Sequence, residues 1–270
     1  MAAVLLVGCG KMGGALLEGW LESGFRANEV TVVEPAANAA AEARQRFGVE
    51  VVGGPEQIPA RFVPRAVVFA VKPQGMDAIV GEYAPFAGAG ATVLSIAAGK
   101  SIAYFQRKLG DAAAIVRSMP NTPAAVRRGI TVASASALVS EPQRKLCNTL
   151  LEAAGEVVWI DDESLLDAVT ATSGSGPAYV FLLVESLAHA GAAAGLPADL
   201  AQRLARATVT GSAALLDASP DSPETLRRNV TSPGGTTAAA LKVLMAEGGM
   251  AALMERAVAA AAQRSRELAD

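Results

Sequence analysis

The sequence contains few of the side chains on which metalloenzymes and many hydrolases depend. Its 270 residues include one histidine and two cysteines. Cys9 and Cys147 are too few for a disulfide framework or a zinc site. The motifs Gly-x-Ser-x-Gly and His-Glu-x-x-His are absent, so neither a serine hydrolase elbow nor a zinc-protease site is expected. The single histidine, His189, lies in an apolar segment, and we interpret it as a packing residue rather than a catalyst.

Aromatic residues and net charge are also low. Aromatic side chains make up 4% of the chain and the net charge is −3, so we expect no stacking platform or basic surface for nucleic acid. The longest uncharged stretches, such as Tyr83–Gly99, are interrupted by glycine and proline and fall short of the roughly 18 to 20 apolar residues of a membrane span. The N-terminus lacks the basic leader of a signal peptide. These features predict a cytoplasmic protein without a membrane or nucleic-acid partner.

The most informative feature is a glycine-spaced turn, Gly8–Gly13, between the apolar run Ala3–Val7 and a helical segment. This order of strand, turn and helix is typical of a dinucleotide-binding unit. Gly8 permits the turn, Gly10 lets the backbone approach a pyrophosphate, and Gly13 lets the helix pack close to the strand. The free N–H groups of the helix start then face the phosphates. The alternative is a glycine-rich turn that binds nothing.

The first half of the chain alternates β-rich and helical segments, which predicts an α/β, Rossmann-like, doubly wound parallel sheet. The expected strands are Ala3–Val7, Val30–Glu34, Val67–Ala70, Val93–Ile96, Ile115–Ser118, Ile130–Ala133 and Glu156–Ile160. The expected helices between them are Met12–Ser23, Asn38–Phe47, Gly75–Tyr83, Ile102–Leu109 and Glu141–Ala154.

The second half is alanine- and leucine-rich with helical spacing. Its expected helices are Ser164–Thr172, Pro177–Ala194, Ala198–Ser219, Thr237–Glu247 and Gly249–Leu268. We therefore expect a dinucleotide-binding domain over residues 1–162 and an all-helical, substrate-binding and dimerisation domain over 163–270. Small side chains bury little apolar area, so we expect a homodimer whose helical domains interleave. The acidic triplet Asp161–Glu163 is interpreted as a solvated helix start rather than a metal site.

Several loops of small or polar residues lie where strands or helices begin and end. Lys72-Pro73 and the segments Ser95–Gly99 and Met119–Pro123 follow strands, at the sheet edge where doubly wound folds bind ligands. Ser173–Tyr179 is expected to open a helix with a serine cap and Pro177 at its first position. Val230–Thr237 combines adjacent glycines, hydroxyls and free N–H groups without an acidic residue, which indicates a carboxylate receptor. Ordinary turns and a plain helix cap are the structural alternatives.

Taken together and in this order, these loops resemble those of the pyrroline-5-carboxylate reductases, the enzymes of the last step of proline synthesis. The resemblance covers the whole chain, and Ser232–Thr237 is its most specific stretch. It implies that 1-pyrroline-5-carboxylate, a cyclic imine acid, is reduced to L-proline by NADPH or NADH. It also implies a homodimer with swapped helical domains, often assembled as five dimers in a homodecamer, with an active site that uses both subunits. A related imine acid as the better substrate is left open.

The resemblance also implies the site residues. Cofactor contacts fall on Gly8, Cys9, Gly10, Lys11, Met12, Gly13, Val71, Lys72, Pro73, Ala97, Ala98 and Asn121, the last near the nicotinamide. Substrate contacts fall on Val230, Ser232, Gly235, Thr236 and Thr237. The Thr237 hydroxyl is the catalytic candidate near the ring nitrogen, and we favour a hydrogen-bonding role because a free threonine is a poor acid. A pre-protonated iminium needs mainly positioning, which fits a site without His, Asp or Glu.

Glu34 ends the second expected strand at about the fingerprint distance from Gly8. An acidic side chain there bonds the adenosine ribose 2′-hydroxyl and repels a 2′-phosphate, so we predict that NADH is used at least as well as NADPH. Lys11 or Asn38 are the groups that would assist a 2′-phosphate.

Two alternative functions are also considered. The β-hydroxyacid dehydrogenases pair a similar glycine turn with a helical domain, but they need a catalytic lysine, and none lies between Lys145 and Lys242. A regulatory protein that binds NAD(P)H without turnover would tolerate loss of the Ser232–Thr237 loop.

Overall fold

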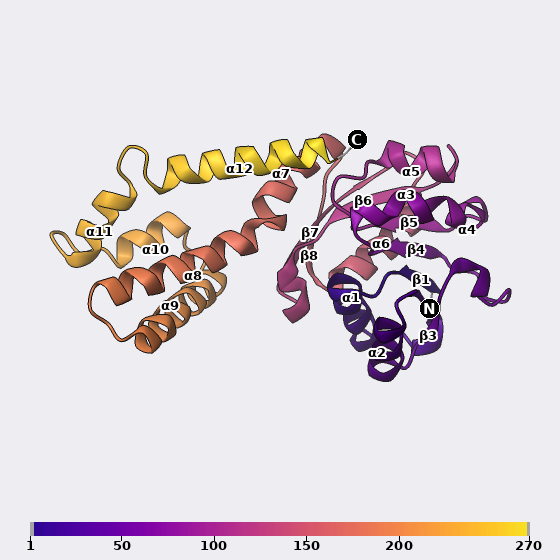
Figure 1. The fold of residues 1–270 in the computed structure, drawn as a ribbon. Helices are drawn as coiled ribbons and strands as arrows, with labels where there is room; N and C mark the ends of the chain where they lie inside the picture. Colours follow the sequence, from indigo (N-terminus) through magenta and orange to yellow (C-terminus); the bar gives the residue numbers. More distant parts are fainter. Residues whose placement is uncertain (1–2, 269–270) are drawn as a thin grey trace. The chain divides into compact units, whose positions relative to one another are not determined.

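The computed structural model describes residues 3–268, which form two compact units (Figure 1). One unit contains the residues up to Ser175 together with those from Ala261 onward, and the other is Gly176–Ala260. Residues 1–2 and 269–270, at the ends of the two expected domains, lie outside the described residues. Over the described part, no helix is both long and apolar enough to cross a membrane.

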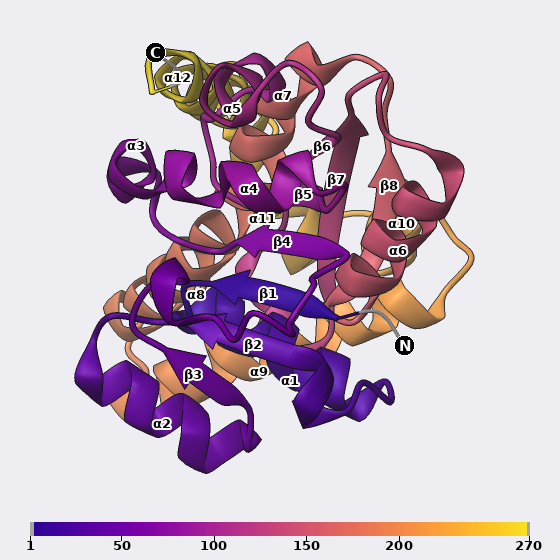
Figure 2. The same cartoon turned by 90° about the vertical axis from the view of Figure 1, so that its right-hand side faces the viewer.

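The first unit is built on a sheet whose strand order is β3-β2-β1-β4-β5-β6-β7-β8. Figure 2 shows β3, β2, β1 and β4 side by side in this order. The strands are β1 Val4–Val7, β2 Val30–Val33, β3 Glu50–Val52, β4 Ala66–Phe69, β5 Thr92–Ser95, β6 Ile115–Met119, β7 Gly129–Ala135 and β8 Gly155–Trp159. The first six run parallel, whereas β7 is antiparallel to β6 and β8 is parallel to β7.

Helices cover both faces of this sheet because its central strands are apolar on both sides. Val4 and Leu6 of β1 point into one core, and Leu5 and Val7 into the other. The helices of this unit are α1 Lys11–Glu22, α2 Ala37–Phe47, α3 Met76–Ile79, α4 Ala84–Gly88, α5 Ile102–Leu109, α6 Glu141–Glu152 and α7 Leu166–Val169. Side chains of α1, α2 and α6 fill the first core, and those of α3, α4 and α5 the second.

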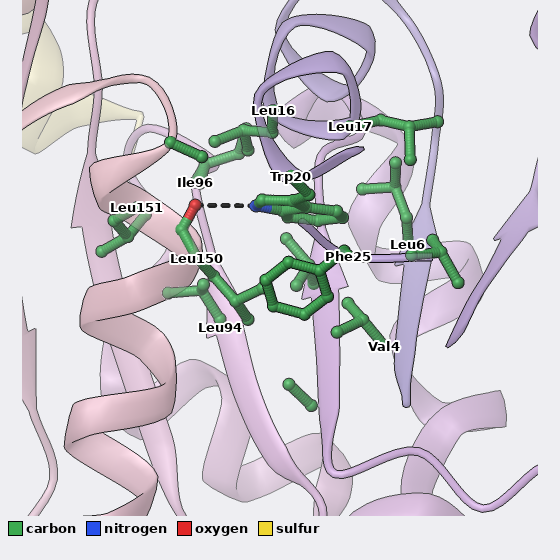
Figure 3. Packing of buried hydrophobic residues seen from close by; sticks show 14 of the residues in the cluster. Val4, Leu6, Leu16, Leu17, Trp20, Phe25, Leu94, Ile96, Leu150 and Leu151 are labelled. Carbon is green, nitrogen blue, oxygen red and sulfur yellow. Dashed lines mark hydrogen bonds between the residues drawn. The ribbon is translucent and has the colours of Figure 1, made fainter. Parts of the chain in front are cut away.

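Trp20 is the largest fully buried side chain in the first core. Its indole Nε1 donates to the Leu150 carbonyl at 2.7 Å, as Figure 3 shows. On the same face of α1, a Cβ at Gly19 would lie 2.3 Å from the Ala153 carbonyl oxygen. The glycine therefore allows α1 to lie directly against the end of α6, and this contact anchors the helix that follows the glycine turn.

The expected doubly wound fold is confirmed, and each expected strand is present with its ends within two residues. Several details were wrong or missed, among them the short helix α4, which was not predicted. The short strand β3 was not predicted, and the expected helix Gly75–Tyr83 is instead a 3-10 turn at Pro73–Gly75, α3, and a second 3-10 turn at Val80–Tyr83. The expected pair at β7 and β8 runs opposite to the other strands.

The second unit is helical, with α8 Gly176–Ala193, α9 Ala198–Ala218, α10 Pro223–Asn229, α11 Thr236–Leu244 and most of α12 Met250–Glu267. The helix α10 was not predicted. The buried residues of α8 and α9 are Ala188, Ala201 and Ala205. Large apolar side chains lie instead on the surface of the chain, and the Phe181 and Leu182 side chains are 61% and 60% exposed. A helical unit with this distribution needs a partner surface to bury its apolar residues.

His189 of α8 is exposed within one chain. It lines a cavity of about 600 Å³ between α8 and α9 together with Glu185, Asp199, Arg203 and Arg206. A packing role for His189 is therefore not seen inside a single chain.

Candidate active site

The carboxyl ends of β1, β4, β5 and β6 surround a cavity of about 660 Å³. Its size lies in the range of small-molecule and cofactor sites. It is lined by Gly10, Lys11, Met12, Ala70, Val71, Lys72, Pro73, Ile96, Ala97, Ala98, Met119, Pro120, Asn121, Thr122 and Gly174. The structure thus gathers the turn, the Lys72-Pro73 loop and the loops after β5 and β6 around one space.

The glycine turn has the geometry that a nucleotide phosphate needs. Gly8 has φ +89°, and a Cβ there would lie 2.6 Å from Val71 Cγ1. A Cβ at Gly13 would lie 2.3 Å from the Gly8 carbonyl oxygen. A Cβ at Gly10, by contrast, would meet no atom of the described residues within 4 Å, and Gly10 faces the cavity. Gly8 and Gly13 therefore close the turn tightly, and Gly10 leaves the space in front of it open.

The start of α1 supplies hydrogen-bond donors to the same space. Gly10 is the N-cap and has no side chain, and the first intrahelical bond runs from Gly14 N–H to the Gly10 carbonyl at 2.8 Å. The N–H groups of Lys11, Met12 and Gly13 precede this pattern, as in any α-helix. Together with the Lys11 side chain they form a positive helix end, which is the environment that phosphate groups bind.

The loops after β4, β5 and β6 are held by local bonds. Lys72 is extended before Pro73, with φ −64° and ψ 142°. The hydroxyl of Ser118 donates to the Ser95 carbonyl at 3.0 Å, and the Ser95 hydroxyl accepts from Ala97 N–H at 3.2 Å. These bonds fix the small residues Ala97 and Ala98 at the cavity wall.

Asn121 lies in the loop just after the carboxyl end of β6, and its side-chain Oδ1 accepts from Ile130 N–H at 3.0 Å. This bond ties the loop after β6 to the first residues of β7. Asn121 lines the cavity, and its bond to β7 gives it a positioning function that its place in the sequence did not reveal.

Neither Glu34 nor Cys9 lines this cavity, but Cys9 is part of the glycine turn and Glu34 is bonded to it. The Glu34 carboxylate accepts from Cys9 N–H and from Ala36 N–H, each at 3.0 Å. Burial first, and then the charges of Glu34 and Glu42, raise the pKa of the Cys9 thiol to about 11. Cys9 is therefore a protonated thiol at neutral pH.

Two neighbouring cavities were not predicted. One, of about 450 Å³, lies beyond the tips of β1, β2 and β3 and includes Pro35, Gly54, Glu56, Lys72 and Glu82. The other, of about 520 Å³, lies between α1 and α2. The residues Gly53–Glu56, which line the first of them, directly follow the unpredicted strand β3. Recognition of that strand would have been the signal for these residues.

The Val230–Thr237 loop belongs to the second unit. Gly234 has φ +71°, Gly235 is the N-cap of α11, and the first intrahelical bond runs from Ala239 N–H to the Gly235 carbonyl at 3.1 Å. The Gly235 N–H itself donates to the Ser232 carbonyl at 3.0 Å, so this amide is used inside the turn. The donors that precede the helical pattern are the N–H groups of Thr236, Thr237 and Ala238.

Two expectations for the sequence 161–179 need correction. The chain passes from α7 to α8 without a serine-capped loop, through a π-helical turn at Thr170–Gly174 in which Ser175 N–H donates to the Thr170 carbonyl at 2.8 Å. Pro177, near the start of α8, has no N–H to continue the normal helical pattern. π-Helical turns are frequent at functional sites.

The acidic triplet is a helix start, since the Asp162 side chain accepts from Ser164 N–H. Glu163, however, is not simply solvated. Its Oε1 accepts from Arg117 Nη1 at 2.9 Å and from Ile102 N–H at 2.8 Å. The Arg117 side chain is 8% exposed, so this is a largely buried ion pair that joins β6 to the start of α5.

Comparison with known proteins shows the family of this chain. Residues 163–268 match the family described as pyrroline-5-carboxylate reductase dimerisation, and residues 3–99 match NADP oxidoreductase coenzyme F420-dependent. A pyrroline-5-carboxylate reductase of Pseudomonas aeruginosa is 41% identical over 99% of this chain and 97% of that protein. The chain belongs to the pyrroline-5-carboxylate reductase family. The pea enzyme, from Pisum sativum, is 37% identical over 97% of this chain and 94% of its own length.

Solved structures agree with this family. A pyrroline-5-carboxylate reductase from Coxiella burnetii has a TM-score of 0.92 at 33% identity and covers 100% of this chain and 99% of its own. The Plasmodium falciparum enzyme, solved with NADP bound, has a TM-score of 0.85 at 28% identity, covering 100% of this chain and 98% of its own. The resemblance that the motifs indicated is confirmed, and so is the expectation of an NAD(P)H-dependent oxidoreductase.

Proposed function

We propose that this chain reduces the C=N bond of 1-pyrroline-5-carboxylate to L-proline with NADPH or NADH, the last step of proline synthesis. The observation that carries the proposal is the chemistry of the 660 Å³ cavity. Its ionisable side chains among the described residues are two cations, Lys11 and Lys72. A cavity of this kind suits an anionic dinucleotide and offers no carboxylate or histidine as an acid–base catalyst.

The residues around the cavity fit the cofactor. Gly10 leaves the space that a phosphate would take, the first N–H groups of α1 supply donors, and Ala97 and Ala98 present a wall without long side chains. When bound, the nicotinamide supplies the hydride for the imine carbon. The protein's part is to orient the two reactants and to exclude water, which can account for most of a rate enhancement when the imine is already protonated.

The substrate carboxylate is assigned to the loop Ser232–Thr237. Its N–H groups at Thr236, Thr237 and Ala238 and its hydroxyls form an anion site at the start of α11. Gly235 contributes its conformation as N-cap rather than its N–H. Val230, 64% exposed at the end of α10, flanks the substrate. The hydroxyl oxygen of Thr237 accepts a hydrogen bond from the protonated ring nitrogen.

The domain division and the assembly are part of the proposal. We assign residues 163–270 to the substrate-binding and dimerisation domain, a division that the family match over 163–268 supports. The compact helical unit of the structure is shorter, Gly176–Ala260. The exposed apolar side chains of α8 and α9 are buried in an interleaved homodimer, and five such dimers form the decamer. The protein acts in the cytoplasm, without nucleic-acid or membrane partners.

The test is a kinetic assay of the purified protein with 1-pyrroline-5-carboxylate, following oxidation of NADH or NADPH. We expect Thr237→Ala to lower kcat/KM about ten- to a hundredfold, or about 1.4 to 2.7 kcal/mol of transition-state binding. The matched control is Thr210→Ala on α9, where the hydroxyl bonds only to main-chain carbonyls of its own helix, Arg206 at 3.0 Å and Ala207 at 3.3 Å. An unchanged kcat/KM in Thr237→Ala would remove Thr237 from the site.

A further inference from the structure

We infer that Glu34, held rigidly at the tip of β2, makes this enzyme select NADH over NADPH. This inference rests on the proposed function because it concerns the cofactor of the same site. A nicotinamide dinucleotide bound to the glycine turn extends its adenosine half toward the end of β2 in this class of fold. The adenosine ribose carries a hydroxyl in NADH and a phosphate in NADPH at its 2′ position, so the charge at this end decides between them.

The Glu34 carboxylate is fixed by two backbone donors. Oε2 accepts from Cys9 N–H in the glycine turn and Oε1 accepts from Ala36 N–H, both at 3.0 Å. The side chain is half-buried, and turning it away would break both bonds. Each carboxylate oxygen can accept a second hydrogen bond, which a ribose hydroxyl can donate and a phosphate cannot. The negative charge therefore stays in place whichever cofactor approaches.

The cavity beside Glu34 is acidic as well. Pro35, the residue after Glu34, lines this cavity, and its charged lining residues are Glu56, Glu82 and one lysine, Lys72. Burial and then the charges of Glu82 and Glu56 raise the pKa of the Tyr83 hydroxyl, which lines the same cavity. A 2′-phosphate carries about −1.5 to −2 charges at neutral pH, so these carboxylates oppose it.

Nearby cations are engaged elsewhere. Arg46 makes a bidentate pair with Glu18, at 2.8 and 2.7 Å. Arg44 donates to the Val51 carbonyl at 2.7 Å. Lys11 lines the cavity between α1 and α2 and also the 660 Å³ cavity, which makes it the cation best able to rescue a 2′-phosphate. Its substitution is therefore an informative second variant.

The test is equilibrium binding, without substrate turnover, of ADP-ribose and 2′-phospho-ADP-ribose by calorimetry. The wild-type protein should bind ADP-ribose about tenfold or more tightly than the 2′-phosphate, as expected for like charges about 4 to 6 Å apart near a partly screened surface. Glu34→Gln should reduce this preference to about threefold or less by charge removal alone. Lys11→Gln should keep the preference for ADP-ribose or increase it. Glu152→Gln, which removes the same charge from the exposed end of α6, is the matched control and should also keep it.

Equal wild-type affinities for the two ligands, or a preference that survives Glu34→Gln, would overturn the inference. Should Glu34→Gln fail to fold, the wild-type protein alone is decisive, because a repulsive preference for ADP-ribose must shrink as salt is raised, and a preference independent of salt would contradict it. Failure of the proposed function would look different. In that case the protein would oxidise neither NADH nor NADPH with 1-pyrroline-5-carboxylate, whatever its affinities for ADP-ribose and 2′-phospho-ADP-ribose.

Discussion

Replacing Gly10 by alanine should separate cofactor binding from folding. The added Cβ meets no atom of the described residues within 4 Å, and the backbone of Gly10, with φ −72° and ψ −165°, lies in a region open to alanine. Loss of glycine from the N-cap costs about 0.5 to 1 kcal/mol, and the less flexible unfolded chain returns about 0.4 to 1 kcal/mol. The free energy of unfolding should therefore change by less than about 0.5 kcal/mol.

Cofactor binding should fall steeply in the same variant. The new methyl group projects into the space in front of the α1 N-terminus, where the N–H groups of Lys11, Met12 and Gly13 would meet the phosphates. Charge-assisted hydrogen bonds of this kind contribute about 1.5 to 3 kcal/mol, so the Kd for NADH should rise about ten- to a hundredfold.

Gly14→Ala is the matched control, since its Cβ would lie in ordinary contact with Phe47 at 4.0 Å. It should keep the wild-type Kd. The measurements are the protein-bound NADH fluorescence for Kd and urea unfolding for stability. If Gly10→Ala bound NADH with the wild-type Kd, the phosphates would not approach this turn.

Three further predictions concern other parts of the chain. Glu163→Gln removes the charge that neutralises Arg117, and urea unfolding should show a loss of about 3 kcal/mol; a loss below about 0.5 kcal/mol would mean that the pair is solvated. Burial raises the pKa of the Cys147 thiol from 9.0 to about 12, so the folded state favours the protonated thiol and loses stability as pH rises from about 9 toward 12. The free energy of unfolding of Cys147→Ala should fall less steeply over this range. An identical dependence on pH in both proteins would show that Cys147 is not the titrating group. Leu182→Glu, in the middle of α8, should shift the protein from dimer toward monomer in sedimentation velocity, whereas Glu152→Gln should remain dimeric.

The elements of the first unit were predictable because their patterns are local. The strands β1 and β4 are entirely apolar and β2 is interrupted only by Thr31. A glycine or proline lies within four residues of the end of each, and these residues punctuate the chain clearly. The strand β3 was missed because only three residues form it and Glu50 breaks its apolar run. The direction of β7 and β8 was also missed, since strand propensity carries no information on whether a neighbour is parallel or antiparallel.

For the candidate site, the lining residues were predictable but their hydrogen bonds were not. The residues that line the cavity come from loops with recognisable motifs, but their hydrogen bonds depend on the assembled sheet. Examples are the bond from Ile130 N–H to Asn121 and the bond from Cys9 N–H to Glu34. The internal use of the Gly235 N–H and the π-helical turn before α8 are also matters of backbone geometry. Motifs identify which residues meet a ligand, and the three-dimensional structure decides which of their polar groups are still available for it.

The most direct test of the central claim is the fate of the transferred hydrogen. The protein is mixed with 1-pyrroline-5-carboxylate and NADH that carries deuterium in both positions of the reactive nicotinamide carbon, and the product is analysed by mass spectrometry. We expect L-proline with a single deuterium bound to the former imine carbon. Oxidation of NADH that left the proline free of deuterium, or no proline at all, would contradict the proposed reaction.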